Sequence, residues 1–265
     1  MIDNQCFSFA GNFIPELEFP RWSSSNLNKL FPSFSLNLKT NNFISYEYNK
    51  DFDKFKNKKI LIVGGGPSTN GFDFNQIEVD HIFTSNSFFL NNKLKDKKVD
   101  IAMVGAEVNT SSDNFIKYVE KYQPWLGFEI HPKWSSITNR EYLNKYLYNS
   151  YNKIFCMQTR YYGCVGVSHR LLVLAMQLKA KEIYYIGIDG PRGMIKGNHS
   201  FEKNKSKLPK LPHHLNVANA EEIFTNAYKD FYTHISKDIK YEGKLVNLGK
   251  NNPDNIIPEH DKYNI

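Results

Sequence analysis

The chain has 265 residues, 41% of them hydrophobic, which is enough to bury a sizeable core in one or two domains. Its net charge of +7 favours anionic partners such as nucleotides, nucleic acid or phospholipids, and a lysine-rich solvated surface is the plain alternative. The 3 cysteines are too few for a disulfide framework and form no Cys-x-x-Cys pair. Without a secretory leader or a run of about 18 apolar residues, we expect a soluble cytoplasmic protein, with peripheral membrane contact through its basic face left open.

Residues 1–57 show no clear periodicity. They mix Pro, Ser and Asn with aromatic residues, as in Phe19-Pro20-Arg21-Trp22. The aromatic residues predict a segment packed on the main domain rather than a disordered tail. The main domain is expected over residues 58–250, followed by a C-terminal tail over residues 251–265.

From residue 58 onward, apolar strand-like runs alternate with amphipathic segments. The predicted strands are 60–63, 81–84, 99–104, 154–157, 182–188 and 245–248, and the predicted helices are 111–122, 166–179 and 217–236. This alternation is typical of an α/β domain with a doubly wound, mostly parallel, Rossmann-like sheet.

The first predicted strand ends abruptly in Gly64-Gly65-Gly66-Pro67-Ser68. The glycines let the backbone approach a ligand closely and adopt positive φ, while the proline fixes a turn and the serine adds a hydroxyl donor. In open α/β sheets, ligands bind beyond the carboxyl ends of the strands. This segment, called the glycine turn below, is therefore predicted to hold a phosphate or a nucleotide.

Two common nucleotide motifs fit the glycine turn poorly. A dinucleotide site needs a third glycine soon after the second and a carboxylate after the next strand, whereas Gly71 comes late and the next strand runs into Ser85-Asn86. A P-loop needs a lysine after its glycines, and none follows here.

Four ordered elements resemble the bacterial sialyltransferase family that uses CMP-activated sialic acid (glycosyltransferase family 42), and the related DUF115/MptE-like group. The first is the glycine turn, and the second is Asn86 after the second strand. The third is a small-residue turn over residues 163–168 that opens an apolar helix, which runs into a strand ending Gly187-Ile188-Asp189. The fourth is the pair His213-His214 before the last predicted helix. The resemblance spans about residues 58–250. It departs at Gly65, where the family carries Asn, and after Asp189, where the family places tyrosines.

The resemblance implies a GT-A-like variant of the Rossmann-like fold and assigns site residues. The nucleotide would be held by Gly64, Gly65, Gly66, Ser68, Asn86, Gly166, Ser168 and Asp189. For Asn86 and Asp189, a turn or cap role is the alternative.

The family uses a histidine as general base, which makes His214 the first candidate and His213 the second. Arg192 and Lys196 would neutralise charge on the leaving phosphate, and residues 190–212 would form a lid. The alternatives are surface histidines and a solvated basic loop. A zinc site that includes His199 lacks a recognised ligand spacing.

The function implied is a metal-independent, inverting glycosyltransferase. It would move a sialic-acid-like residue (a nonulosonic acid or Kdo) from a CMP-activated donor to a cell-surface glycan in lipopolysaccharide or capsule biosynthesis. The CMP-sugar is a donor substrate, no separate cofactor is expected, nucleic acid is not an expected partner, and a homo-oligomer is left open. Two alternatives remain: an MptE-like pterin pyrophosphokinase, which would need ATP and Mg²⁺, and a non-catalytic nucleotide-binding protein.

Overall fold

The computed structural model describes residues 50–104, 108–128, 153–156, 166–189, 199–202 and 241–249. In chain order these residues form η3 (Lys50–Phe55), β1 (Lys59–Val63), η4 (Pro67–Gly71), β2 (His81–Ser85), η5 (Phe88–Leu90), β3 (Ile101–Val104), α4 (Asp113–Tyr122), β4 (Trp125–Phe128), β5 (Ile154–Cys156), α7 (Gly166–Gln177), β6 (Glu182–Ile186) and β7 (Lys244–Asn247).

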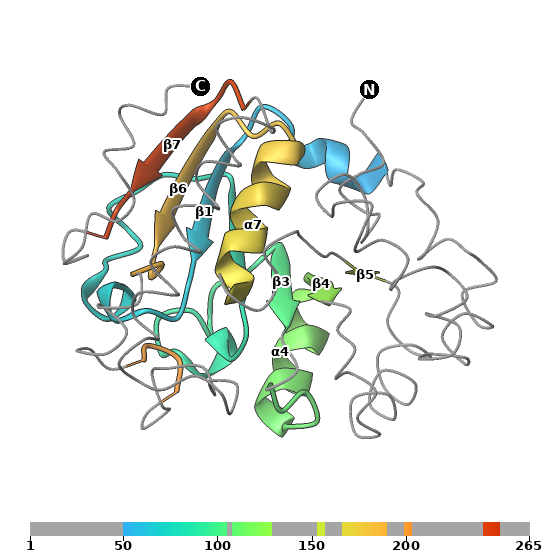
Figure 1. Cartoon of the computed structure of the whole chain (residues 1–265). Helices are drawn as coiled ribbons and strands as arrows, with labels where there is room; N and C mark the ends of the chain where they lie inside the picture. The colour runs from blue at the N-terminus through green and yellow to red at the C-terminus, as the bar shows by residue number, and fades with distance from the viewer. Residues whose placement is uncertain are drawn as a thin grey trace, which may run out of the picture.

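The strands of the described residues form one sheet in the order β5-β4-β3-β2-β1-β6-β7, and every neighbouring pair is parallel (Figure 1). From β1 the chain builds outward through β2 to β5, and it then returns to the other side of β1 with β6 and β7. The strand order therefore reverses between β1 and β6, which makes this pair the topological switch point of the sheet.

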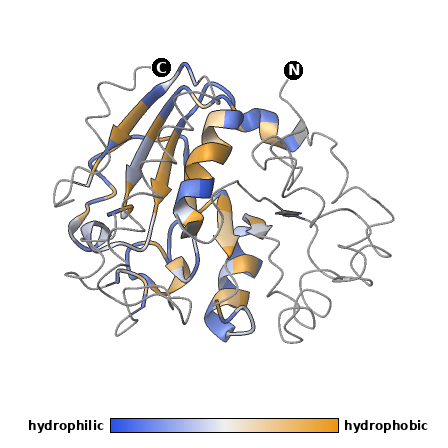
Figure 2. Ribbon diagram, viewed as in Figure 1, coloured by the Kyte–Doolittle hydropathy of each residue, from blue (hydrophilic) through white to orange (hydrophobic). Residues whose placement is uncertain are grey.

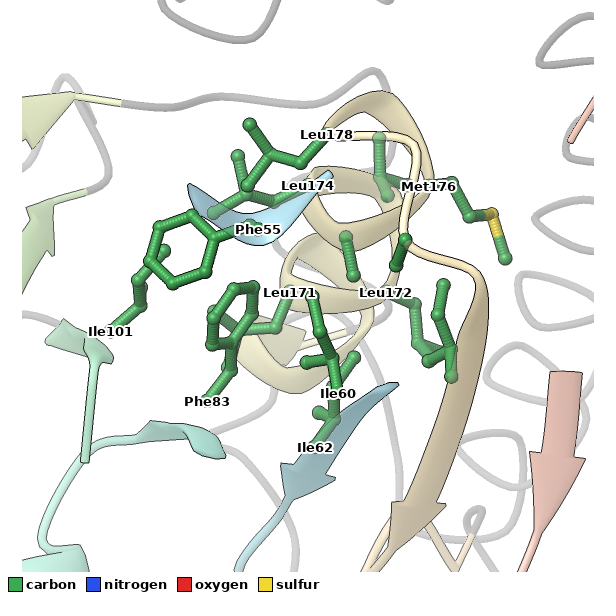
Figure 3. Packing of buried hydrophobic residues seen from close by; sticks show 14 of the residues in the cluster. Phe55, Ile60, Ile62, Phe83, Ile101, Leu171, Leu172, Leu174, Met176 and Leu178 are labelled. Carbon is green, nitrogen blue, oxygen red and sulfur yellow. The ribbon is translucent and has the colours of Figure 1, made fainter. Parts of the chain in front are cut away.

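The two faces of the sheet bury two separate cores. On one face Ile60 and Ile62 of β1 pack with the apolar residues of α7, and Figure 3 shows this cluster. On the other face Leu61 and Val63 pack with Phe115 and other residues of α4. The residues of β1 thus alternate between two buried faces, and a helix covers each face. This arrangement confirms the predicted doubly wound α/β fold.

Helix α7 covers the central strands because nearly its whole length is apolar. It contacts β1, β2, β3 and β6, and Figure 2 shows polar residues confined mainly to its first turns. Its N-terminus follows β5 and precedes β6 in a parallel sheet, so it lies at the carboxyl edge of the strands. Among the described residues, no helix has the length and apolarity needed to cross a bilayer.

Most of the predicted strands and helices within the described residues are present with shifted ends. The strand predicted over 182–188 ends at Ile186, because Gly187 has φ +74° and turns the chain out of the strand. Strand β4 was not predicted. Its four residues, WLGF, are short and interrupted by Gly127. The helix predicted over 217–236 lies outside the described residues.

The N-terminal segment is described only from residue 50. Phe52 and Phe55 of η3 are fully buried in the core beneath α7, where both rings meet other aromatic side chains. Residues 1–49 and the tail over 251–265 lie outside the described part, so the predicted domain boundaries stay predictions.

Candidate functional site

Three connections meet at the carboxyl edge of the sheet. The glycine turn follows β1, Asn86 follows β2, and Gly187-Ile188-Asp189 follows β6. Because β1 lies between β2 and β6, these connections come from three adjacent strands at the switch point. We call this group of residues the switch-point site.

The glycine turn owes its glycines to close packing. Among the described glycines, only Gly187 has positive φ, so the expectation of positive φ in the triplet was wrong. The Gly64 N–H donates to the Ile186 carbonyl at 2.8 Å, and the Gly66 N–H donates to the Gly187 carbonyl at 2.9 Å. A Cβ at Gly64 or Gly66 would collide with the Gly187 carbonyl. The backbone of the turn is therefore bonded directly to the end of β6.

Ser68 and Asp189 connect the same two segments through side chains. The Ser68 N–H donates to Asp189 Oδ2 at 2.7 Å, and the Ser68 hydroxyl donates to Asp189 Oδ1. The hydroxyl oxygen also accepts from the Gly187 N–H at 3.0 Å. Asp189 therefore caps the start of η4, and both donors of Ser68 are engaged within the chain.

Burial makes Asp189 an unusual carboxyl group. Only 4% of the residue is exposed. Loss of solvation raises the pKa of Asp189 above its ordinary value of 3.8, and the hydrogen bonds from Ser68 act in the opposite direction. The hydrogen bonds from Ser68 therefore favour the charged form of the carboxyl group and act against the effect of its burial.

Asn86 follows β2 with a left-handed backbone, φ 55°, and its N–H donates to the Met103 carbonyl at 2.8 Å. Asparagine tolerates this conformation better than most residues, and non-glycine residues held in it often occur at functional sites. The residue is half-buried at the rim of the sheet. Its position suits the predicted contact with a nucleotide, which stays a prediction.

The first turn of α7 lies beside the glycine turn. Ser168 Oγ lies 3.1 Å from Ser85 Oγ and would be 3.0 Å from a Cβ at Gly64. The N-terminus of α7, which begins at Gly166, adds a partial positive charge to this edge of the sheet. The predicted nucleotide-binding residues are thus brought together here.

Residues 199–202 cross the glycine turn and were not predicted to do so. The Ser200 N–H donates to the Gly65 carbonyl at 2.9 Å, and the Ser200 hydroxyl donates to the Gly66 carbonyl at 2.6 Å. Asn91 Nδ2 donates to the Ser200 carbonyl at 3.0 Å, and Phe201 is buried in the core. This part of the predicted lid is therefore fixed to the domain.

This contact could not be predicted from the sequence, because His199 and Ser200 belong to no local motif. They also lie far from the turn in the chain, since Ser200 and Gly66 are 134 residues apart. The predicted catalytic residues His213, His214, Arg192 and Lys196 lie outside the described residues. Across the part of the chain that the structure describes, no group of three or more His, Cys, Asp and Glu side chains could hold a metal ion.

No family model and no curated protein sequence matches this chain. Among solved structures, it is similar to the sialyltransferase CST-II in complex with a trisaccharide acceptor and CMP, with 16% identity and a TM-score of 0.47 over 73% of this chain and 82% of that chain. It is also similar to the sialyltransferase CstII from Campylobacter jejuni in complex with the substrate analogue CMP-3FNeuAc, with 18% identity and a TM-score of 0.42 over 73% and 81% of the two chains. At this level of likeness, the function has to be inferred from the residues of the chain itself.

Proposed function

We propose that this protein is a glycosyltransferase that moves a sialic-acid-like residue, a nonulosonic acid or Kdo, from a CMP-activated donor to a cell-surface glycan. The observation that supports it most is the convergence of the glycine turn, Asn86 and Gly187–Asp189 at the switch point. This is the place where open α/β sheets bind nucleotides, and these are the residues that the sequence motifs select.

The switch-point site offers the donors that a nucleotide monophosphate needs. Among the described residues, none accepts a hydrogen bond from the Gly65 N–H, and Gly65 is the partly exposed glycine of the triplet. The first turn of α7, at the positive end of the helix, lies beside Gly64, where Ser168 Oγ would be 3.0 Å from a Cβ. A backbone N–H and a helix N-terminus favour a phosphate, while the amide of Asn86 suits a ribose hydroxyl or a base edge.

In the proposed reaction, the oxygen of an acceptor hydroxyl attacks the anomeric carbon of the donor sugar. A new carbon–oxygen bond forms as the bond from that carbon to the phosphate oxygen breaks, and CMP leaves with the electron pair. The acceptor proton passes to an imidazole, for which His214 is the first candidate and His213 the second. Arg192 and Lys196 would stabilise the negative charge on the departing phosphate.

The proposal is tested by incubating the protein with a panel of CMP-activated sugars and glycan acceptors, and by measuring released CMP. Acceptor-dependent release is expected, and His214→Ala is expected to abolish release while CMP binding persists. The His213→Ala variant is the matched comparison, because it removes the neighbouring imidazole. Absence of release from every CMP-sugar tested, or consumption of ATP and a pterin that requires Mg²⁺, would overturn the proposal.

A further inference from the structure

A buried threonine lies behind the glycine turn. Thr69 is fully buried, and its hydroxyl donates to the Gly64 carbonyl at 2.8 Å. A Cβ placed on Gly187 would be 2.2 Å from both the Thr69 hydroxyl oxygen and the Gly64 carbonyl oxygen. The absence of a side chain at Gly187 therefore leaves room for this hydrogen bond, which joins a side chain in the interior to the backbone of the turn.

The hydrogen bond from Thr69 sets the direction of the peptide group between Gly64 and Gly65. Every peptide bond of the described residues is trans, and in a planar trans peptide the C=O and the N–H point in opposite directions. Because the Gly64 carbonyl points toward Thr69, the Gly65 N–H points away from it. Gly65 is the partly exposed residue of the triplet, and within the described part of the chain nothing accepts a hydrogen bond from its N–H.

The two neighbouring peptide groups are each held at both their carbonyl and their N–H. Their partners, in chain order, are the Thr84 hydroxyl, the Ile186 carbonyl, the Ser200 N–H and the Gly187 carbonyl. In the described structure, the peptide between Gly64 and Gly65 is bonded at its carbonyl alone. It also lies between two residues without a Cβ, so rotation of this peptide group meets little steric resistance. The Thr69 hydroxyl is therefore the contact that fixes the direction of the Gly65 N–H.

We propose that Thr69 is a positioning residue that directs the Gly65 N–H toward a phosphate oxygen of the ligand held at the glycine turn. This inference rests on the proposed function for the identity of that ligand, CMP or its sugar conjugate. Thr69 is buried and acts through the backbone, without touching the ligand. An N–H that already points outward needs no rearrangement when the ligand arrives, and its hydrogen bond to an anionic oxygen is of the stronger, charge-assisted kind.

Two substitutions separate the hydroxyl of Thr69 from its shape. Thr69→Val removes the hydroxyl and keeps the branched shape, whereas Thr69→Ser keeps the hydroxyl and removes the methyl group. Thr84→Val is the matched control. The Thr84 hydroxyl is equally buried and donates at the same distance, 2.8 Å, to the Val63 carbonyl, but the peptide group that it contacts is also held by the Gly64 N–H.

Binding of CMP, cytidine and inorganic phosphate to the full-length chain is measured by titration calorimetry, at a temperature where thermal unfolding shows each variant to be folded. Thr69→Val is expected to bind CMP about tenfold more weakly than the wild-type protein, the change that about 1.4 kcal/mol produces, and to bind cytidine equally well. Thr69→Ser is expected to keep the wild-type affinity for CMP. Thr84→Val is expected to lower the unfolding temperature as much as Thr69→Val does, with no change in CMP affinity.

Three results of these titrations would overturn the inference. They are wild-type CMP affinity in Thr69→Val, a loss of CMP affinity in Thr84→Val as large as that in Thr69→Val, and a loss of cytidine affinity in Thr69→Val as large as the loss for CMP.

A second measurement does not depend on how well the variants fold. In wild-type protein with isotope-labelled glycine, the amide proton resonance of Gly65 is expected to move downfield when CMP or phosphate binds, and to stay in place when cytidine binds. A Gly65 resonance that stays in place while CMP is bound would show that this N–H does not contact the phosphate, and the role of Thr69 would then be wrong.

The same titrations distinguish this inference from the proposed function. If the wild-type protein binds phosphate but not CMP, and Thr69→Val weakens the binding of phosphate, the cytidine donor is wrong and the role of Thr69 stands. If Thr69→Val binds CMP as tightly as the wild-type protein does, the role of Thr69 is wrong and the nucleotide site stands. If the wild-type protein binds neither CMP nor phosphate, both are wrong.

Discussion

The hydroxyl of Ser68 is predicted to stabilise the charged form of the Asp189 carboxyl group, and the substitution Ser68→Ala tests this prediction directly. The substitution removes one hydrogen bond to a buried carboxylate, which contributes about 1.5–3 kcal/mol, and leaves the Gly187 N–H without its acceptor, which costs about 1–3 kcal/mol. Because the two bonds share one oxygen, their effects do not simply add. The expected loss of unfolding free energy is about 2–4 kcal/mol near neutral pH.

This loss should depend on pH. Burial raises the folded-state pKa of Asp189 above 3.8, so as pH rises through the window from 3.8 to the raised pKa, the folded protein keeps a proton that the unfolded chain releases, and stability falls. Ser68→Ala removes an influence that lowers this pKa, so the window widens and the destabilisation grows with pH. It should be smallest in acid, where the carboxyl group is protonated in both states.

Urea unfolding, followed by tryptophan fluorescence in acid and near neutral pH, measures both effects. Ser111→Ala is the matched control, because that hydroxyl bonds to Asn109 at the surface and its loss should change stability by at most about 0.5 kcal/mol. If Ser68→Ala behaves like Ser111→Ala, or if its effect is the same at both pH values, the proposed coupling of Ser68 to Asp189 is wrong.

Three further substitutions address the turn, the rim and the core. Gly187→Ala should lower the free energy of unfolding in urea by about 2–4 kcal/mol, because a non-glycine residue at φ +74° costs roughly 1–2 kcal/mol and its Cβ would meet the Gly64 carbonyl. Gly71→Ala is the control and should be nearly neutral, because nothing lies near its Cβ. Equal losses of stability in the two variants would contradict the close contact between Gly187 and Gly64. Asn86→Gly should keep the backbone and the stability while weakening CMP binding about tenfold in calorimetry, and unchanged affinity would remove the amide from the site. Leu174→Ala should cost about 2–5 kcal/mol, because this side chain of α7 is fully buried in the core. Leu90→Ala, at a residue 43% exposed, should cost little, and a small effect at Leu174 would contradict the packing.

The strands were predictable because their burial on two faces leaves continuous apolar runs. Ile60–Val63 is such a run, and its adjacent residues Leu61 and Ile62 pack in opposite cores. Strand ends were less predictable, since they depend on backbone geometry such as the positive φ of Gly187. Strand β4 was missed because a four-residue segment with a glycine has no clear period.

The position of the site followed from the rule that ligands bind where the strand order reverses, and Gly64–Ser68 marks that place in the sequence. The internal contacts did not follow from it. Ser68 was expected to face a ligand, and the structure shows its donors bonded to Asp189. The packing of His199 against Gly65 is a contact between distant segments, which no local pattern reveals.

Hydrogen exchange of the full-length protein, with and without saturating CMP, measures the central claim most directly. We predict that CMP slows amide exchange in peptides that cover the glycine turn, with Gly65 affected most, and in those that contain Asn86 or Gly187. Exchange that stays unchanged in all three connections, or protection that appears only elsewhere in the chain, would contradict a nucleotide site at the junction of β1 and β6.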